Sequence, residues 1–90
     1  MIIDFKQQQL KQFLTLFSWL KQHPEEYKYF THVADFYQAT WFEKLPKSVD
    51  YAVTGLDDGA EEFSIRLSLY GHVILLDCAE ECYLRYIAAD

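Results

Sequence analysis

Residues 63–77 read FSIRLSLYGHVILLD, and their hydrophobic pattern decides the fold. From Phe63 to Leu69 every second side chain is apolar, with serine or arginine between, which predicts an antiparallel strand with one buried face. Gly71-His72 can reverse the chain in a short hairpin turn, and HVILLD then predicts a strand that is covered on both faces. This stretch therefore predicts the centre of a small antiparallel sheet.

The residues before this stretch add one more strand. Val49, Tyr51 and Val53 again place apolar side chains at every second position, which is typical of a half-buried strand. GLDDGAE, residues 55–61, then supplies the glycines and aspartates of a turn. The sheet is therefore predicted to contain three strands.

The tail after the third strand fits two interpretations. Asp77 followed three positions later by Glu80 resembles a helix capping box, so we predict a short helix over residues 78–89. YLRYI, residues 83–87, could equally extend a strand.

Two helices are predicted ahead of the sheet. Apolar residues recur at three- and four-residue steps between Asp4, a suitable N-cap, and Gln22. Pro24 suits the first turn of a second helix, which we expect to continue to about Lys44. These elements predict a single α+β domain over residues 1–90, with two N-terminal amphipathic helices packed on a three-stranded antiparallel sheet and a short C-terminal helix.

The charge of the chain is concentrated in its second half. Residues 1–47 hold six lysines and five acids, whereas residues 48–90 hold two arginines and nine acids, so the halves carry +1 and −7. Phosphate would be repelled by the second half, which disfavours direct nucleic-acid binding and favours a basic protein partner. No apolar run is long enough to span a membrane and no signal peptide is evident, so we expect a cytoplasmic protein with reduced thiols.

Aromatic residues are concentrated between Tyr27 and Phe42, where seven of sixteen positions carry a ring. On a helix they would form two neighbouring stripes that cover roughly 180°, more than a surface helix needs to reach its core. Either the second helix lies between the first helix and the sheet, which would bury both stripes, or one stripe remains free for a partner. Trp19 is expected on the polar side of the first helix, which adds weight to an aromatic contact surface.

The chemistry-bearing residues do not form a recognisable catalytic motif. Cys78 and Cys82 are spaced C-x3-C, and with His72 or His32 they make only a weak metal-binding pattern, so we expect two buried thiols. A nucleophilic site of Cys82, His72 and Asp77 lacks the spacing that would support it. We therefore predict no enzyme, no cofactor and no metal.

The acidic surface and the surplus of aromatic residues suggest a binding function. We predict a small acidic inhibitor that occludes the basic functional surface of a partner, such as a nuclease toxin or another nucleic-acid-binding protein. In size, acidity and lack of catalytic motifs the chain resembles toxin-immunity proteins and phage-encoded inhibitors, although no motif ties it to one family. The predicted partner-binding residues are Asp50, Asp57, Asp58, Glu61, Glu62, Glu80, Glu81, Trp19, Tyr29 and Phe36. The alternative is a homodimer or structural subunit assembled through the aromatic face of the second helix.

Overall fold

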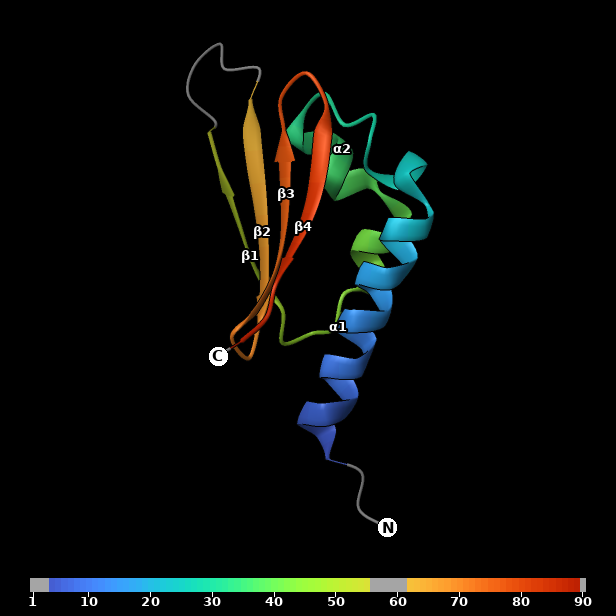
Figure 1. The fold of residues 1–90 in the computed structure, drawn as a ribbon, viewed down its shortest axis with the longest axis vertical. Coiled ribbons are helices and arrows are strands. Elements are labelled where there is room, and N and C mark those ends of the chain that lie inside the picture. Colours follow the sequence, from blue (N-terminus) through green and yellow to red (C-terminus); the bar gives the residue numbers. More distant parts are fainter. Residues whose placement is uncertain (1–3, 56–61, 90) are drawn as a thin grey trace.

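The protein folds into two layers, a four-stranded antiparallel sheet and a set of helices that cover one of its faces (Figure 1). The computed structural model describes residues 4–55 and 62–89. The elements, in chain order, are α1 Phe5–Gln22, the 3₁₀ helix η1 Pro24–Glu26, α2 Val33–Gln38, the 3₁₀ helix η2 Thr40–Lys44, and the strands β1 Asp50–Thr54, β2 Phe63–Leu69, β3 His72–Cys78 and β4 Cys82–Ile87. The predicted α+β class is confirmed, with helices preceding strands.

All four strands pair with their neighbours in chain order. The hairpin between β2 and β3 turns at Tyr70 and Gly71, which have φ angles of 50° and 86°, and Leu69 pairs with His72. Two successive positive φ angles match the right-handed twist of the strands in a two-residue hairpin. The predicted hairpin is therefore confirmed, with its turn one residue earlier than expected.

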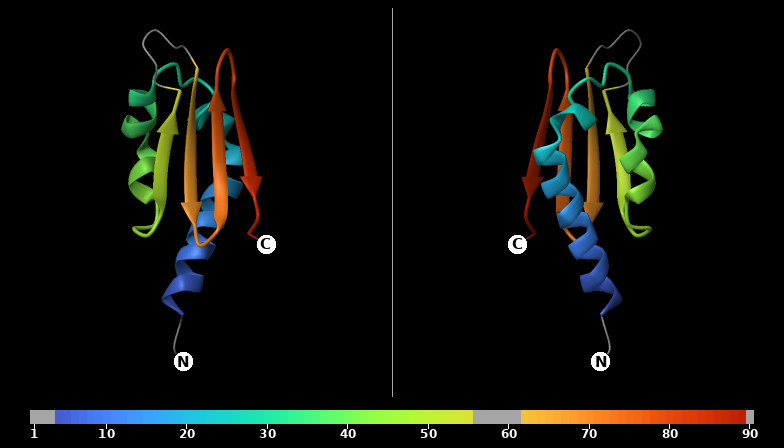
Figure 2. Two further views of the ribbon diagram at one scale, coloured as in Figure 1. Left: turned by 90° about the vertical axis from the view of Figure 1, so that its left-hand side faces the viewer. Right: turned by 90° about the vertical axis from the view of Figure 1, so that its right-hand side faces the viewer.

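The second face of the sheet carries no helix from the described part of the chain (Figure 2). We call this the open face. Its side chains include Arg66 of β2, Leu75 of β3 and Arg85 of β4, which the register places in one row. The prediction that β3 is covered on both faces is therefore wrong, because helices cover only one of them, although Val73 on the open face is itself buried.

The predicted C-terminal helix is also wrong, since Cys82–Ile87 form a fourth strand, β4. The more buried side chains of β4 occupy alternate positions, namely Cys82, Leu84 and Tyr86. Asp77, expected to cap a helix, instead uses its carboxylate to bind Ser64 and Arg85. The period of two in YLRYI prevails because a strand here pairs with the otherwise unpaired edge of β3.

The first helix matches its predicted bounds. Asp4 caps it, with one carboxylate oxygen accepting a hydrogen bond from the backbone N–H of Lys6 at 3.0 Å. The apolar side chains that it buries are Phe13, Leu16 and Leu20. No helix within residues 4–55 and 62–89 is both long and apolar enough to cross a membrane.

The second predicted helix, Pro24 to Lys44, is broken into the short pieces η1, α2 and η2. Residues 27–32 separate η1 from α2, and Ala39 separates α2 from η2. His32 and Ala39 both have extended backbone, with ψ of 150° and 138°. His32 and Asp35 form a capping box that starts α2, since Asp35 Oδ2 accepts from the backbone N–H of His32 at 3.2 Å. This segment contains many aromatic and β-branched residues, which lose side-chain freedom in a continuous helix and so lower its helix propensity. Tertiary packing therefore determines the backbone conformation of the segment.

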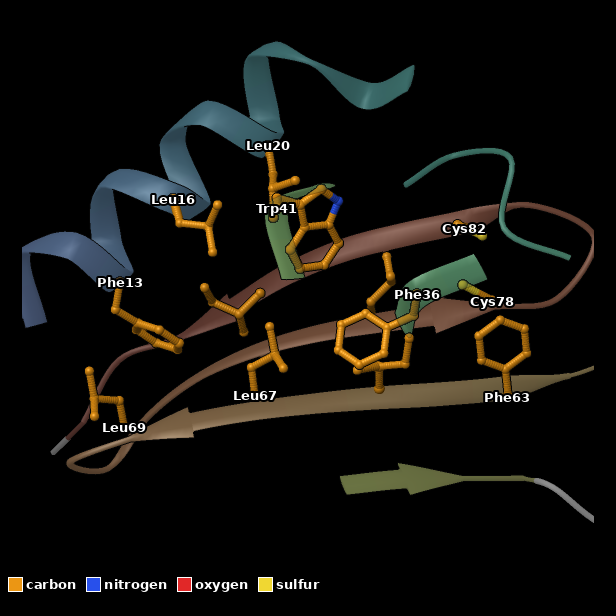
Figure 3. Close-up of a cluster of buried hydrophobic side chains, with 13 residues drawn as sticks. Phe13, Leu16, Leu20, Phe36, Trp41, Phe63, Leu67, Leu69, Cys78 and Cys82 are labelled. Carbon is orange, nitrogen blue, oxygen red and sulfur yellow. The ribbon is translucent and has the colours of Figure 1, made fainter. Parts of the chain in front are cut away.

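Two aromatic residues of this segment, Phe36 and Trp41, lie in the core between the two layers (Figure 3). Phe36 and Trp41 are almost completely buried, and their ring centroids lie 5.5 Å apart. Phe36 also packs edge-on against Phe42 at 5.0 Å and Tyr51 of β1 at 6.1 Å. Burial therefore accounts for much of the aromatic surplus, while Tyr29 remains 72% exposed.

Candidate protein-binding site at the acidic end of the sheet

Two chain connections leave the sheet at the same end, the upper end in Figure 1. The connection from β1 to β2 departs at Gly55 and returns at Glu62, and the turn between β3 and β4 spans residues 79–81. The antiparallel order of the strands places Gly55, Glu62 and the β3–β4 turn at this same end. Among the residues that the structure describes, this end carries the acidic side chains Glu62, Asp77, Glu80 and Glu81, and we call it the acidic end.

A hollow of about 290 Å³ lies at the acidic end. It is lined by Gly55, Glu62, Phe63, Ser64, Asp77, Cys78, Ala79, Glu81 and Tyr83. Three of these residues contribute carboxylates, and Tyr83 contributes an exposed aromatic ring. Carboxylates beside an aromatic ring can receive an ammonium or guanidinium group, since the ring face also attracts a cation.

Hydrogen bonds fix two of the carboxylates in the hollow. Asp77 accepts from Ser64 Oγ at 2.7 Å and from Arg85 Nη2 at 2.8 Å, so its charge is already compensated. Glu81 accepts from the Tyr83 hydroxyl at 3.0 Å. This hydrogen bond raises the pKa of Tyr83, because ionisation would place a second negative charge beside the carboxylate. Tyr83 is therefore a neutral donor that orients Glu81.

The remaining two glutamates are available to a partner. Glu62 and Glu80 are exposed, and neither forms an ion pair or a side-chain hydrogen bond with another described residue. Exposed charge of one sign raises the local concentration and the association rate of oppositely charged ligands. The acidic end thus combines two oriented carboxylates with two uncompensated ones.

Two tyrosines lie close to this end on opposite layers of the fold. The Cys82 thiol donates to the Phe30 carbonyl oxygen at 3.4 Å, which holds the segment before α2 against the start of β4. Tyr29 adjoins Phe30 and is 72% exposed, while Tyr83 lies on the open face and is 61% exposed. Tyrosines that present a large apolar ring and a polar tip are frequent anchors in protein interfaces.

Only some of the acids predicted to bind a partner lie together. Glu62, Glu80 and Glu81 belong to the acidic end. Asp50 pairs with Ser68, which places it at the far end of β1. The predicted residues that lie outside the described part of the chain are Asp57, Asp58 and Glu61.

Two aromatic residues predicted to bind a partner lie elsewhere. Phe36 has no exposed surface, so it cannot contact a partner while α2 stays folded, and the prediction is wrong on this residue. Trp19 was expected on the polar side of the first helix, but it is partly buried and packs against the edge of the core. Its ring lies 4.9 Å from that of His23 and 5.4 Å from the Lys44 ammonium, so it belongs to the helical layer.

The two cysteines lie together at the acidic end of the sheet, apart from His72. Cys78 and Cys82 are direct cross-strand partners, both are buried, and burial raises the pKa of the Cys78 thiol. His72 lies at the other end of β3, where its Nδ1 is 2.6 Å from the Tyr86 hydroxyl. It is therefore distant from Asp77, near the acidic end of β3, and from Cys82 at the start of β4. Among the residues that the structure describes, no three His, Cys, Asp or Glu side chains are placed to hold a metal ion.

Asp77 and Tyr83 line the hollow but are not among the predicted partner-binding residues. Both lie on the open face next to each other, because β3 and β4 pair there. The alternating pattern of residues 82–87 could have predicted their proximity. If these residues form a strand that pairs with β3, Tyr83 lies opposite Asp77.

Comparison with known proteins finds no protein-family model, no curated protein and no solved structure that matches this chain.

Proposed function

We propose that the protein is a binding module that covers a basic surface of a partner protein with its acidic end. The observation that supports this most strongly is the hollow, in which the carboxylates of Glu62, Asp77 and Glu81 accompany the ring of Tyr83. An arginine or lysine of the partner would enter the hollow, where its charge meets the carboxylates of Glu62 and Glu81 and its alkyl chain packs on the ring. Glu80 and Tyr29 would widen the contact around it.

A partner that binds nucleic acid fits this chemistry. Arginine and lysine side chains that hold phosphate would pair with the carboxylates instead, and the protein would act by occlusion. A nuclease toxin is one such partner, and in that case the protein would serve as its immunity protein or antitoxin. The mechanism needs no reaction, because steric and electrostatic blocking suffices.

The structure gives less support to the alternative homodimer. It relied on a free aromatic stripe of the second helix, and each of the two predicted stripes has a residue buried in the core, Phe36 in one and Trp41 in the other. We therefore do not propose assembly through this stripe.

Affinity capture from host lysate tests the proposal, with two variants that change the net charge by the same amount. The acidic-end variant is E62Q/E80Q/E81Q, and the control variant is E25Q/E43Q/D50N. We expect the wild type and the control to retain a stoichiometric basic protein at low salt and to release it at high salt. With the captured partner, the acidic-end variant should associate about tenfold more slowly and with a weaker dependence on salt. If the acidic-end variant binds as fast as the control, the acidic end is not the site.

A further inference from the structure

A second hollow lies on the helical layer, away from the acidic end. It has a volume of about 380 Å³ and is bounded by α1 and η2. The lining residues are Lys11, Gln12, Thr15, Leu16, Trp19 and Lys44. We call it the lysine groove. Its volume falls within the range of pockets that hold small organic ligands.

The polar groups of the lysine groove are all able to donate hydrogen bonds. Lys11 and Lys44 contribute ammonium groups, Gln12 an amide and Thr15 a hydroxyl, and none of the described residues that line the groove carries a carboxylate. This composition contrasts with the net charge of −6 of the whole chain. The charge of the groove is therefore complementary to an anion.

The remaining walls are apolar. Leu16 is a core residue, and Trp19 packs against the edge of the core with its indole ring lining the groove. The Lys44 ammonium lies 5.4 Å from the centroid of the Trp19 ring, within reach of a cation–π interaction. An ammonium held over the ring keeps N–H donors for a second partner, because it has three of them. Lys44 can thus bind an anionic head group at the place where Trp19 offers an apolar wall.

We infer that the lysine groove binds a small amphiphilic carboxylate, with the carboxylate between Lys11 and Lys44 and the apolar body along Leu16 and Trp19. The groove does not depend on the acidic end, so the two proposals can fail separately. Trp19 also provides a reporter, since the second tryptophan, Trp41, is buried and donates to the Glu26 carbonyl oxygen at 3.0 Å.

Decanoate, kept below its micelle-forming concentration, is the probe. We expect it to change the fluorescence of the wild type but not of W19F, and to shift the amide resonances of residues 11–19 and 40–44. Decanol and decyltrimethylammonium, which have the same chain length without the negative charge, should bind at least about tenfold more weakly, because a charge-assisted hydrogen bond is lost.

Two lysine variants of equal charge complete the test. K11Q/K44Q should weaken decanoate binding at least about tenfold, whereas K28Q/K47Q, which removes two lysines outside the groove, should leave it within twofold. Circular dichroism checks that both variants fold, as expected for exposed lysines. Three results would overturn the inference: equal binding of decanol and decanoate, equal effects of the two lysine variants, or amide shifts outside the groove.

Discussion

Replacing Phe36 by alanine tests whether the aromatic surplus stabilises the core. Phe36 has no exposed surface, and its ring lies 5.0–6.1 Å from four other aromatic rings. Truncating a buried phenylalanine to alanine costs about 3–5 kcal/mol, from lost burial and from the cavity left behind. A small domain is stable by only about 5–15 kcal/mol, so this one change removes a large share of the total.

Phe5 provides the matched control, since it is 65% exposed and the F5A substitution deletes the same atoms. We expect F5A to change the free energy of unfolding by less than about 0.5 kcal/mol. F36A should lower the melting temperature by more than about 12 °C, and F36L, which keeps most of the apolar volume, should lose less. Urea and thermal unfolding, followed by circular dichroism and tryptophan fluorescence, measure all three. If F36A and F5A cost the same, the aromatic cluster does not stabilise the core and the account of the fold fails.

Three further predictions concern the backbone, the pH dependence and the thiols. G55A should destabilise the protein by roughly 1–3 kcal/mol in urea unfolding, because Gly55 has φ 83° and an added Cβ would lie 2.8 Å from a backbone carbonyl oxygen; an unchanged midpoint would contradict this. The hydrogen bond from the backbone N–H of Thr31 lowers the pKa of Asp35. The stability that the charged Asp35 contributes is therefore fully present above the ordinary aspartate pKa and is lost as the pH falls through the lowered pKa. The free energy of unfolding of D35N should therefore fall less steeply than that of the wild type as the pH is lowered into the acidic range. An unchanged slope would refute this role of Asp35. Cys78 and Cys82 should react with a maleimide only after unfolding, as mass spectrometry can check; labelling of the native protein would contradict their burial.

The elements predicted correctly are those whose sequence pattern lies within the element itself. Asp4 and the apolar spacing up to Gln22 define α1 without help from the rest of the chain. The alternation from Phe63 to Leu69 and the following turn likewise specify a hairpin, because a shift of one residue would turn its apolar face outward.

The elements predicted wrongly are those that tertiary contacts decide. Residues 24–44 contain enough apolar residues for a helix, but the packing of Phe36 and Trp41 against the sheet breaks them into three pieces. Residues 82–87 fit helix and strand equally well in isolation, and the exposed edge of β3 selects the strand. The same pairing brings Asp77 and Tyr83 together, so the error in the tail concealed that these two residues line one hollow.

The acidic end was predicted in part because charge is visible in composition. Glu62, Glu80 and Glu81 come from two connections that any antiparallel hairpin order would place at one end. Asp50 could not be separated from them without the strand register, which assigns it to the opposite end.

Mapping a guanidinium probe onto the labelled protein tests the central claim most directly. Hexa-arginine would be titrated into ¹⁵N-labelled wild type, E62Q/E80Q/E81Q and E25Q/E43Q/D50N, and the amide shifts compared residue by residue. The account predicts shifts at Gly55, at residues 62–64 and at residues 77–83 in the wild type and the control, with a loss of most of them in the acidic-end variant. Shifts of equal size around Asp50, or an acidic-end variant that binds as well as the control, would contradict it.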